Sequence, residues 1–222
     1  MNKNRMFLIG SAALLVGVFG GRAYFDRNQA AENAAPAYRV DNAKLVRAHS
    51  PIKGNKDAPV TIVEFLDPEC ESCRAMQPIT DALLDEFSGR IRIVIRYLPL
   101  HPNSAYASAA LEETREIGKY EEALNLFYSR QPQWASHHDP KPEFISKYLI
   151  ELGIDKKKTG EEYLVSKHKP KLALDLQDAK DLGLQQTPTF FVNGRLLSEL
   201  GYQALKREIG KELAEGLPSE KK

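Results

Sequence analysis

The apolar residues of the chain are spaced as in two strands on either side of a helix. Residues 60–66, VTIVEFL, are β-branched and almost continuously apolar, as in a buried strand, and residues 90–98 alternate as in a second strand. Between them apolar residues recur at three- and four-residue steps, which predicts a helix from near Cys70 to about Ser88. The order β-α-β predicts two parallel strands joined by a right-handed crossover.

The rest of the chain predicts a block of helices, a hairpin and a last helix. Residues 104–184 carry the helical period throughout. Within residues 187–198 an Asn-Gly pair separates two apolar runs, which is typical of a β-hairpin, and residues 201–216 are again amphipathic. The sequence therefore predicts an α/β domain that carries a helical insertion.

The N-terminus has the pattern of an export signal. Lys3 and Arg5 precede an uncharged, mostly apolar run from Met6 to Gly21, and Arg22 follows. Two alternatives remain open, a removed signal peptide and an uncleaved anchor, since the run is slightly shorter than the roughly 20 residues that span a bilayer. The positive-inside rule places the remainder of the chain outside the cytoplasm in either case.

These patterns divide the chain into six expected segments. The boundaries follow the changes in composition and period along the sequence. The segments are a signal peptide or membrane anchor (1–25), a flexible spacer (26–49), the first half of the α/β domain (50–103), the helical insertion (104–184), the second half (185–216) and a tail (217–222).

Composition excludes two classes of protein. The 31 basic residues nearly balance the 30 acidic ones, for a formal net charge of +1, which argues against nucleic-acid binding. The two cysteines are too few for a small fold that disulfides hold together, so a hydrophobic core has to stabilise the domain.

Both cysteines lie in the motif CESC, at Cys70 and Cys73. A structural disulfide across two residues would remove little entropy from the unfolded chain, and a zinc site needs about four ligands where no second CxxC exists. Redox exchange fits better, because the start of a helix stabilises a thiolate. We expect Cys70 to be an exposed nucleophile of lowered pKa and Cys73 to resolve its mixed disulfides, with no metal and no cofactor beyond the redox-active Cys70–Cys73 disulfide.

Two further features are open to a catalytic and to a purely structural interpretation. Glu64 interrupts an apolar strand, either on the wet face of an edge strand or as a buried carboxyl of raised pKa that exchanges a proton with Cys73. Pro188 opens the strand TFFV, either as an edge feature or as a cis proline. A cis proline would bring the backbone of Thr187 beside the sulfurs, where it can bind an extended substrate chain.

Several stretches together resemble the DsbA-like branch of the thioredoxin superfamily. They are SPIKGNKDAPVTIVEF, VEFLDPECESC, RYLPLHPNSAYASAALEE and QQTPTFFVNG, and the resemblance covers about residues 51–213. It implies a thioredoxin fold with an inserted helical domain and an activity on disulfides of exported proteins. By position, Cys70 matches the attacking cysteine, Cys73 the resolving one, Pro188 the cis proline and Glu64 the buried acidic residue.

The residues between the cysteines depart from the family pattern. Strong oxidants of the family usually carry Pro-His there, whereas this chain has Glu71 and Ser72. The charge of Glu71 opposes a very low thiolate pKa, while Ser72 can donate a hydrogen bond, so we expect a milder oxidant. With Thr187, these two residues are candidates for substrate contact. His101, in the motif PLHPNS, is a further candidate for the substrate groove or a loop histidine without a chemical role.

The predicted function is an extracytoplasmic thiol–disulfide oxidoreductase, periplasmic or at the outer face of the cytoplasmic membrane, either N-terminally anchored or secreted. Its expected substrates are exported proteins with free thiols, and we expect a monomer that binds no nucleic acid. The resemblance implies reoxidation by a membrane partner of the DsbB-like or vitamin K epoxide reductase-like kind. The alternatives are a disulfide reductase or isomerase on the same fold, and a metal- or peptide-binding module whose thiols do not turn over.

Overall fold

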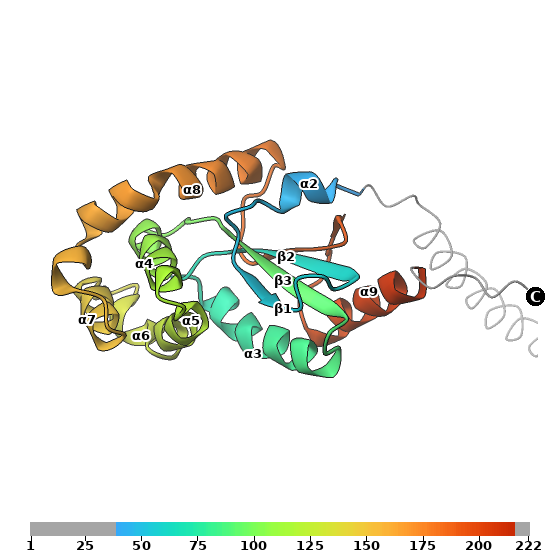
Figure 1. Ribbon diagram of the computed structural model, residues 1–222, viewed down its shortest axis with the longest axis horizontal. Coiled ribbons are helices and arrows are strands. Elements are labelled where there is room, and N and C mark those ends of the chain that lie inside the picture. Colours follow the sequence, from blue (N-terminus) through green and yellow to red (C-terminus); the bar gives the residue numbers. More distant parts are fainter. Residues whose placement is uncertain (1–38, 216–222) are drawn as a thin grey trace, which may run out of the picture. The chain divides into compact units, whose positions relative to one another are not determined.

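A five-stranded sheet organises the domain in the computed structural model, which describes residues 39–215 (Figure 1). Its strand order is β1-β3-β2-β4-β5, with β2 parallel to β3 and antiparallel to β4. The strands are β1 (Ile52–Gly54), β2 (Val60–Leu66), β3 (Ile91–Tyr97), β4 (Thr189–Val192) and β5 (Arg195–Leu196). The parallel β-α-β unit and the hairpin that the sequence predicts are both confirmed.

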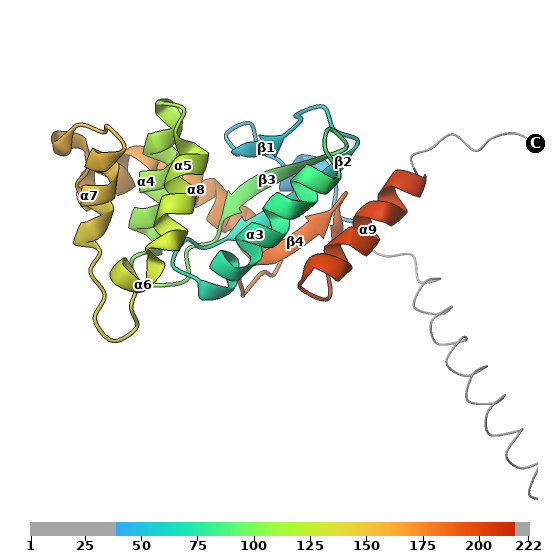
Figure 2. The same ribbon diagram turned by 90° about the horizontal axis from the view of Figure 1, so that it is seen from below.

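Helices cover both faces of this sheet. They are α2 (Asn42–Leu45), α3 (Glu71–Glu86), α4 (Ser104–Glu116), α5 (Tyr120–Ser129), α6 (Gln131–Trp134), α7 (Glu143–Glu151), the 3₁₀ turn η1 (Lys156–Lys158), α8 (Glu161–Asp181) and α9 (Tyr202–Glu215). Helices α3 and α9 lie on one face, and α2 and the end of α8 lie on the other (Figures 1 and 2). This arrangement is the thioredoxin fold with a helical insertion that the sequence predicts.

The position of β2 at the centre of a sheet covered on both faces explains why its sequence is almost entirely hydrophobic. Ile62 and Leu66 point into the core under α3 and α9, whereas Val63 and Phe65 point to the core under α8. Every residue of β2 is buried, because a strand in the middle of a covered sheet has no wet face. The strand thus provides a rigid support for the loop at its C-terminal end, which carries the cysteines.

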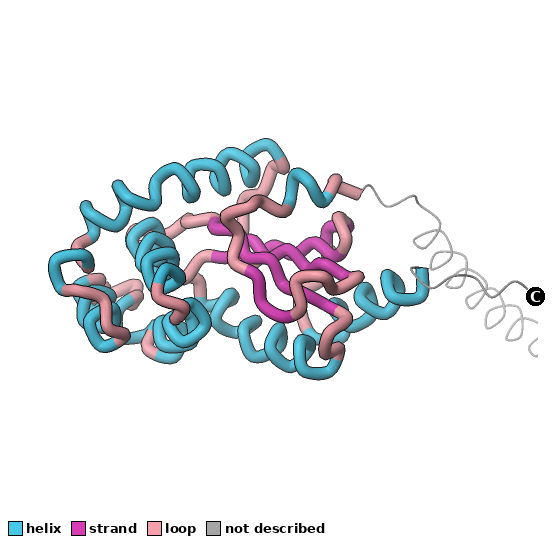
Figure 3. Tube along the Cα trace, in the orientation of Figure 1, coloured by secondary structure: helices cyan, strands magenta, loops and turns pink. Residues whose placement is uncertain are grey.

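The insertion forms a block of helices at one end of the sheet, from α4 to the start of α8 (Figure 3). Its core contains Trp134, which is fully buried beside Phe127 and donates a hydrogen bond from Nε1 to the Phe127 carbonyl at 2.9 Å. Helix α8 runs unbroken through Pro170 and returns the chain from this block to the sheet. The loop after β2, which carries the cysteines, therefore lies at the end of the sheet that faces the insertion.

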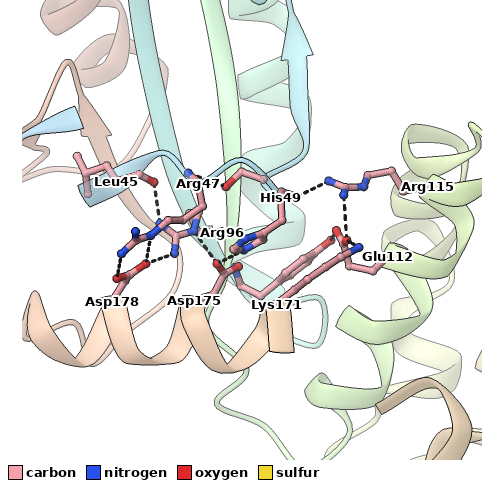
Figure 4. Close-up of polar contacts among 11 residues, drawn as sticks. Leu45, Arg47, His49, Arg96, Glu112, Arg115, Lys171, Asp175 and Asp178 are labelled. Atoms are coloured by element: carbon pink, nitrogen blue, oxygen red, sulfur yellow. Dashed lines mark hydrogen bonds and ion pairs between the residues drawn. The ribbon is translucent and has the colours of Figure 1, made fainter. Parts of the chain in front are cut away.

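A buried ion network fixes α8 to the sheet (Figure 4). Arg96 of β3, with a fully buried side chain, donates from Nε to Asp175 at 2.7 Å and from Nη2 to Asp178 at 2.5 Å. Arg47 pairs with Asp178 at 2.6 Å, and the His49 ring lies 2.7 Å from Asp175. Buried charges are tolerated only when they are paired in this way. The network therefore ties the segment before β1, the central sheet and the insertion to one another.

The predicted spacer at 26–49 is wrong for residues 39–49, which belong to the folded domain. Val40 and Leu45 are buried, and the Val40 amide donates to the Gly194 carbonyl at 2.8 Å. Arg39 pairs with Glu212 of α9 at 2.7 Å. The segment is too short to show an apolar period, and its partners lie far along the chain, so its sequence gives no local signal of packing.

The remaining terminal predictions fall outside the described residues. These are the signal or anchor at 1–25, the rest of the spacer at 26–38 and the tail at 217–222. Within residues 39–215, none of the helices combines the length and the apolar character that crossing a membrane requires.

One strand was not predicted from the sequence. This strand, β1, lies in the segment that leads into β2 and pairs antiparallel with β3.

Candidate functional site

Cys70 is the N-cap of α3, directly after the loop that follows β2. Its position leaves the first backbone N–H groups of the helix directed toward its sulfur. The pKa of Cys70 is lowered to about 5, mainly by a hydrogen bond from the Cys73 thiol. Burial opposes this shift, while hydrogen bonds from Thr187 and from the backbone of Cys73 and Ser72 add to it. The predicted low pKa is therefore what the geometry produces.

Exposure of Cys70 is smaller than predicted. The residue is 8% exposed, so only a small part of it reaches solvent, and Cys73 is fully buried. The cover comes from Thr187, whose carbonyl oxygen lies 3.4 Å from the Cys70 sulfur, and from Gln131 of α6, whose Nε2 donates to the Cys70 carbonyl at 3.1 Å. Both residues are distant in sequence, and for that reason the cover was not foreseen.

Cys73 has the opposite electrostatic character. Its pKa is raised well above that of a free thiol, first by burial and then by the hydrogen bond with Cys70 and the charge of Glu64. The Asp67 backbone N–H, at 3.4 Å from the Cys73 sulfur, partly offsets these effects. At neutral pH the reduced pair therefore holds a thiolate at Cys70 and a proton at Cys73.

Glu64 lies beneath the thiols, in the strand at the centre of the sheet. The edge-strand alternative is wrong, because β2 has β3 on one side and β4 on the other. Glu64 is 3% exposed, and burial raises its pKa to about 8, an effect that the nearby charge of Lys53 reduces and that of Asp81 increases. A carboxyl of this pKa can both accept and donate a proton near neutral pH.

Thr187 and Pro188 lie opposite the cysteines, at the start of β4. The peptide bond between them is cis, one of the two alternatives that the sequence left open. Because β4 pairs with β2 at Thr189 and Phe65, this turn is held beside the C-terminal end of β2. The backbone of Thr187 is thereby placed next to the sulfur of Cys70.

Two acidic residues in the loop before Cys70 were missed. Asp67 is fully buried and accepts hydrogen bonds from the Leu100 amide at 2.7 Å, from the His101 ring at 2.7 Å and from the Ser104 hydroxyl. Glu69 accepts from the Asn103 amide at 2.7 Å. These carboxylates join the cysteine loop to the loop between β3 and α4. The sequence showed only two acids around a proline, with no sign of their partners.

The exposed first turn of α3 carries Glu71 and Ser72. His137, from the loop between α6 and α7, lies 2.9 Å from a Glu71 carboxylate oxygen, and its ring centre is 6.5 Å from that of His101. The structure thus brings all the predicted site residues to one end of the sheet and adds His137 from the insertion.

Comparisons with known proteins agree with this geometry. Residues 47–211 match the protein family described as thioredoxin. A Na⁺/H⁺ antiporter NhaA of Herminiimonas arsenicoxydans is 33% identical over 150 residues, which are 66% of this chain; the chain spans only 22% of that relative's length.

Solved structures share the fold. Oxidised BdbD of Bacillus subtilis aligns with a TM-score of 0.67 at 24% identity, over 75% of this chain and 94% of that one. The thiol–disulfide exchange protein α-DsbA2 of Wolbachia pipientis aligns with a TM-score of 0.63 at 19% identity, over 77% and 90%. The chain belongs to the thioredoxin family, and it shares the fold, helical insertion included, of these DsbA-like structures.

Proposed function

We propose that the chain forms disulfide bonds in exported proteins by dithiol exchange at Cys70 and Cys73. The observation that carries this proposal is that the pKa values of the two thiols shift in opposite directions, down at Cys70 and up at Cys73. A thiolate of low pKa at Cys70 is stable when reduced and is a good leaving group, so the Cys70–Cys73 disulfide accepts electrons readily. Transfer of electrons from substrate thiols to the enzyme is therefore favoured.

The exchange proceeds in two displacements. A substrate thiolate attacks the Cys70 sulfur, the Cys70–Cys73 bond breaks, and Cys73 leaves and takes up a proton from Glu64. A second substrate thiolate then attacks the substrate sulfur of the mixed disulfide, and Cys70 leaves as a thiolate. The substrate loses two electrons and two protons, and the enzyme disulfide gains both electrons. One of the protons restores the proton that Glu64 gave to Cys73, and the other goes to solvent.

Substrate would bind in extended form along the turn at Thr187 and Pro188. The backbone beside the Cys70 sulfur provides hydrogen-bonding groups, as in other sites where a peptide adds to the edge of a sheet. A membrane partner, DsbB-like or vitamin K epoxide reductase-like, would then reoxidise the enzyme. The apolar run that follows Lys3 and Arg5 supports action outside the cytoplasm.

Trapping tests the chemistry. In a Cys73→Ala variant the Cys70 thiolate can still attack a disulfide of a substrate, with one substrate sulfur leaving as a thiolate. Such a variant should accumulate mixed disulfides through Cys70 in cells, because no Cys73 thiol is present to displace the captured substrate from Cys70. The matched control is the double variant Cys70→Ala/Cys73→Ala, which should trap none. Absence of adducts from the single variant would contradict dithiol exchange with protein substrates.

The direction of electron flow needs a separate measurement. Alkylation of the thiols in intact cells should find Cys70 and Cys73 mostly in the disulfide form, as an oxidase requires. A mostly reduced pair would instead indicate a reductase or isomerase on the same fold.

A further inference from the structure

An imidazole is joined to the cysteine loop through Asp67, although none lies between the cysteines. His101 reaches the site from the loop between β3 and α4, and its Nδ1 is 2.7 Å from Asp67 Oδ2. The backbone N–H of the same Asp67 lies 3.4 Å from the Cys73 sulfur. One residue of the cysteine loop thus holds both the imidazole and a thiol.

The hydrogen bonds of Asp67 fix the orientation of this ring. The carboxylate is fully buried and also accepts from the Leu100 amide at 2.7 Å and from the Ser104 hydroxyl, so it has little freedom to move. With Nδ1 donating to Asp67, the second ring nitrogen of His101 carries the proton that makes it a cation. The His101 side chain is 29% exposed, so this proton can exchange with solvent.

The charges that face His101 favour that cation. Burial by itself would lower the pKa of His101, but the hydrogen bond and charge of Asp67, with the charges of the Cys70 thiolate and Glu69, raise it. The neighbouring ring of His137, from the loop between α6 and α7, is already paired with Glu71. The groups around His101 are thus mostly anionic, and Cys70 is one of them.

We infer that His101 stabilises the Cys70 thiolate, so that the loop between β3 and α4 supplies the cation that Glu71 and Ser72 do not. This deepens the proposed function and rests on it. His101 is a positioning residue here, since it acts through the Cys70 thiolate and forms no bond with the substrate. The thiolate and the imidazolium stabilise each other, so loss of one weakens the other. Formation of a disulfide at Cys70 removes the thiolate and should therefore lower the proton affinity of His101.

Substitution at His101 measures the first half of this coupling. His101→Gln should raise the midpoint of the pH dependence of Cys70 alkylation by roughly half to one pH unit, as expected for loss of one nearby opposite charge. His101→Lys, which restores a cation, should recover part of the shift. His138→Gln is the matched control, because His138 is exposed in the loop between α6 and α7 and its backbone N–H donates to the Ser136 hydroxyl.

The redox equilibrium should move with the thiolate. A shift of that size makes the disulfide roughly three- to tenfold more stable against glutathione in His101→Gln, and the tenfold limit corresponds to about 30 mV. Unchanged alkylation and glutathione equilibria in a His101→Gln protein that melts like the wild type would overturn the inference.

The second half is read from the histidine itself. In an NMR titration of the purified protein, the His101 ring should titrate at lower pH in the disulfide form than in the dithiol form, by about the shift that His101→Gln causes at Cys70. Equal midpoints in the two forms would refute the coupling. No substrate is present, so this outcome is independent of Cys73→Ala trapping, which tests the proposed function.

Discussion

Replacing Glu64 by glutamine should stabilise the folded protein while it impairs the reaction. Burial raises the pKa of Glu64 from 4.5 to about 8, so the folded protein holds this proton more tightly than the unfolded chain. The resulting loss of stability is absent below pH 4.5, grows as the unfolded carboxyl ionises, and is complete above pH 8. At about 1.36 kcal/mol for each pH unit, the penalty is about 3 kcal/mol at pH 7 and about 5 kcal/mol at pH 9.

Urea unfolding at several pH values measures this penalty. The wild type and Glu64→Gln are compared in the disulfide form, so that no thiol titrates in the folded state. We expect nearly equal free energies of unfolding at pH 4.5, and a difference in favour of Glu64→Gln that widens as the pH rises to 8. The matched control is Glu121→Gln on α5, since Glu121 is exposed and should show no such widening.

A difference between wild type and Glu64→Gln that stays constant with pH would refute the reasoning. It would mean that Glu64 ionises in the folded protein as it does in water, and that it holds no proton for Cys73 at neutral pH. If the difference widens with pH as expected, Glu64→Gln should also form the mixed disulfide with substrate more slowly, because glutamine has no acidic proton to give to Cys73 as it leaves.

Two further substitutions test the packing. Arg96→Ala leaves the buried carboxylate of Asp175 without its arginine and should lower the free energy of unfolding by about 3–5 kcal/mol. Arg47→Ala removes a half-exposed partner of Asp178 and should lower it by about 1 kcal/mol or less. Urea unfolding measures both losses, and two small, equal losses would contradict a buried network. Leu45→Ala should cost about 2–4 kcal/mol in the same assay if residues 39–49 are packed as the structure shows, and an unchanged stability would restore the spacer interpretation.

The features that sequence predicted are those whose cause is local. The run at 60–66 is apolar on both faces because both faces are covered, and the pattern records this directly. The turn at Asn193 and Gly194 takes positive φ at both residues, the conformation for which that pair is selected. Cys70 begins a helix because the strand pattern ends just before it and the helical period starts just after it.

The features that sequence missed depend on residues far apart in the chain. Asp67 gave no sign that it would bind His101, because nothing in either motif specifies the other. Leu45 lies in a polar stretch and becomes fully buried only when it meets the end of α8 and the sheet. His137 comes from a loop without an apolar period, and its contact with Glu71 joins the insertion to a residue that lies 66 positions earlier in the chain.

In the proposed oxidase, oxidising power and rate should depend on different parts of this site. The surroundings of Cys70, at the start of α3, set the stability of the thiolate and hence the tendency of the enzyme to accept electrons. The surroundings of Glu64, in the central strand β2, should set the supply of a proton to Cys73 and hence the speed of the first displacement. The two groups lie on separate elements, so a substitution at His101 should change the redox equilibrium with little effect on the pH dependence of unfolding that Glu64 causes. The reverse should hold for Glu64→Gln, because the proton that it removes is not part of what stabilises the Cys70 thiolate.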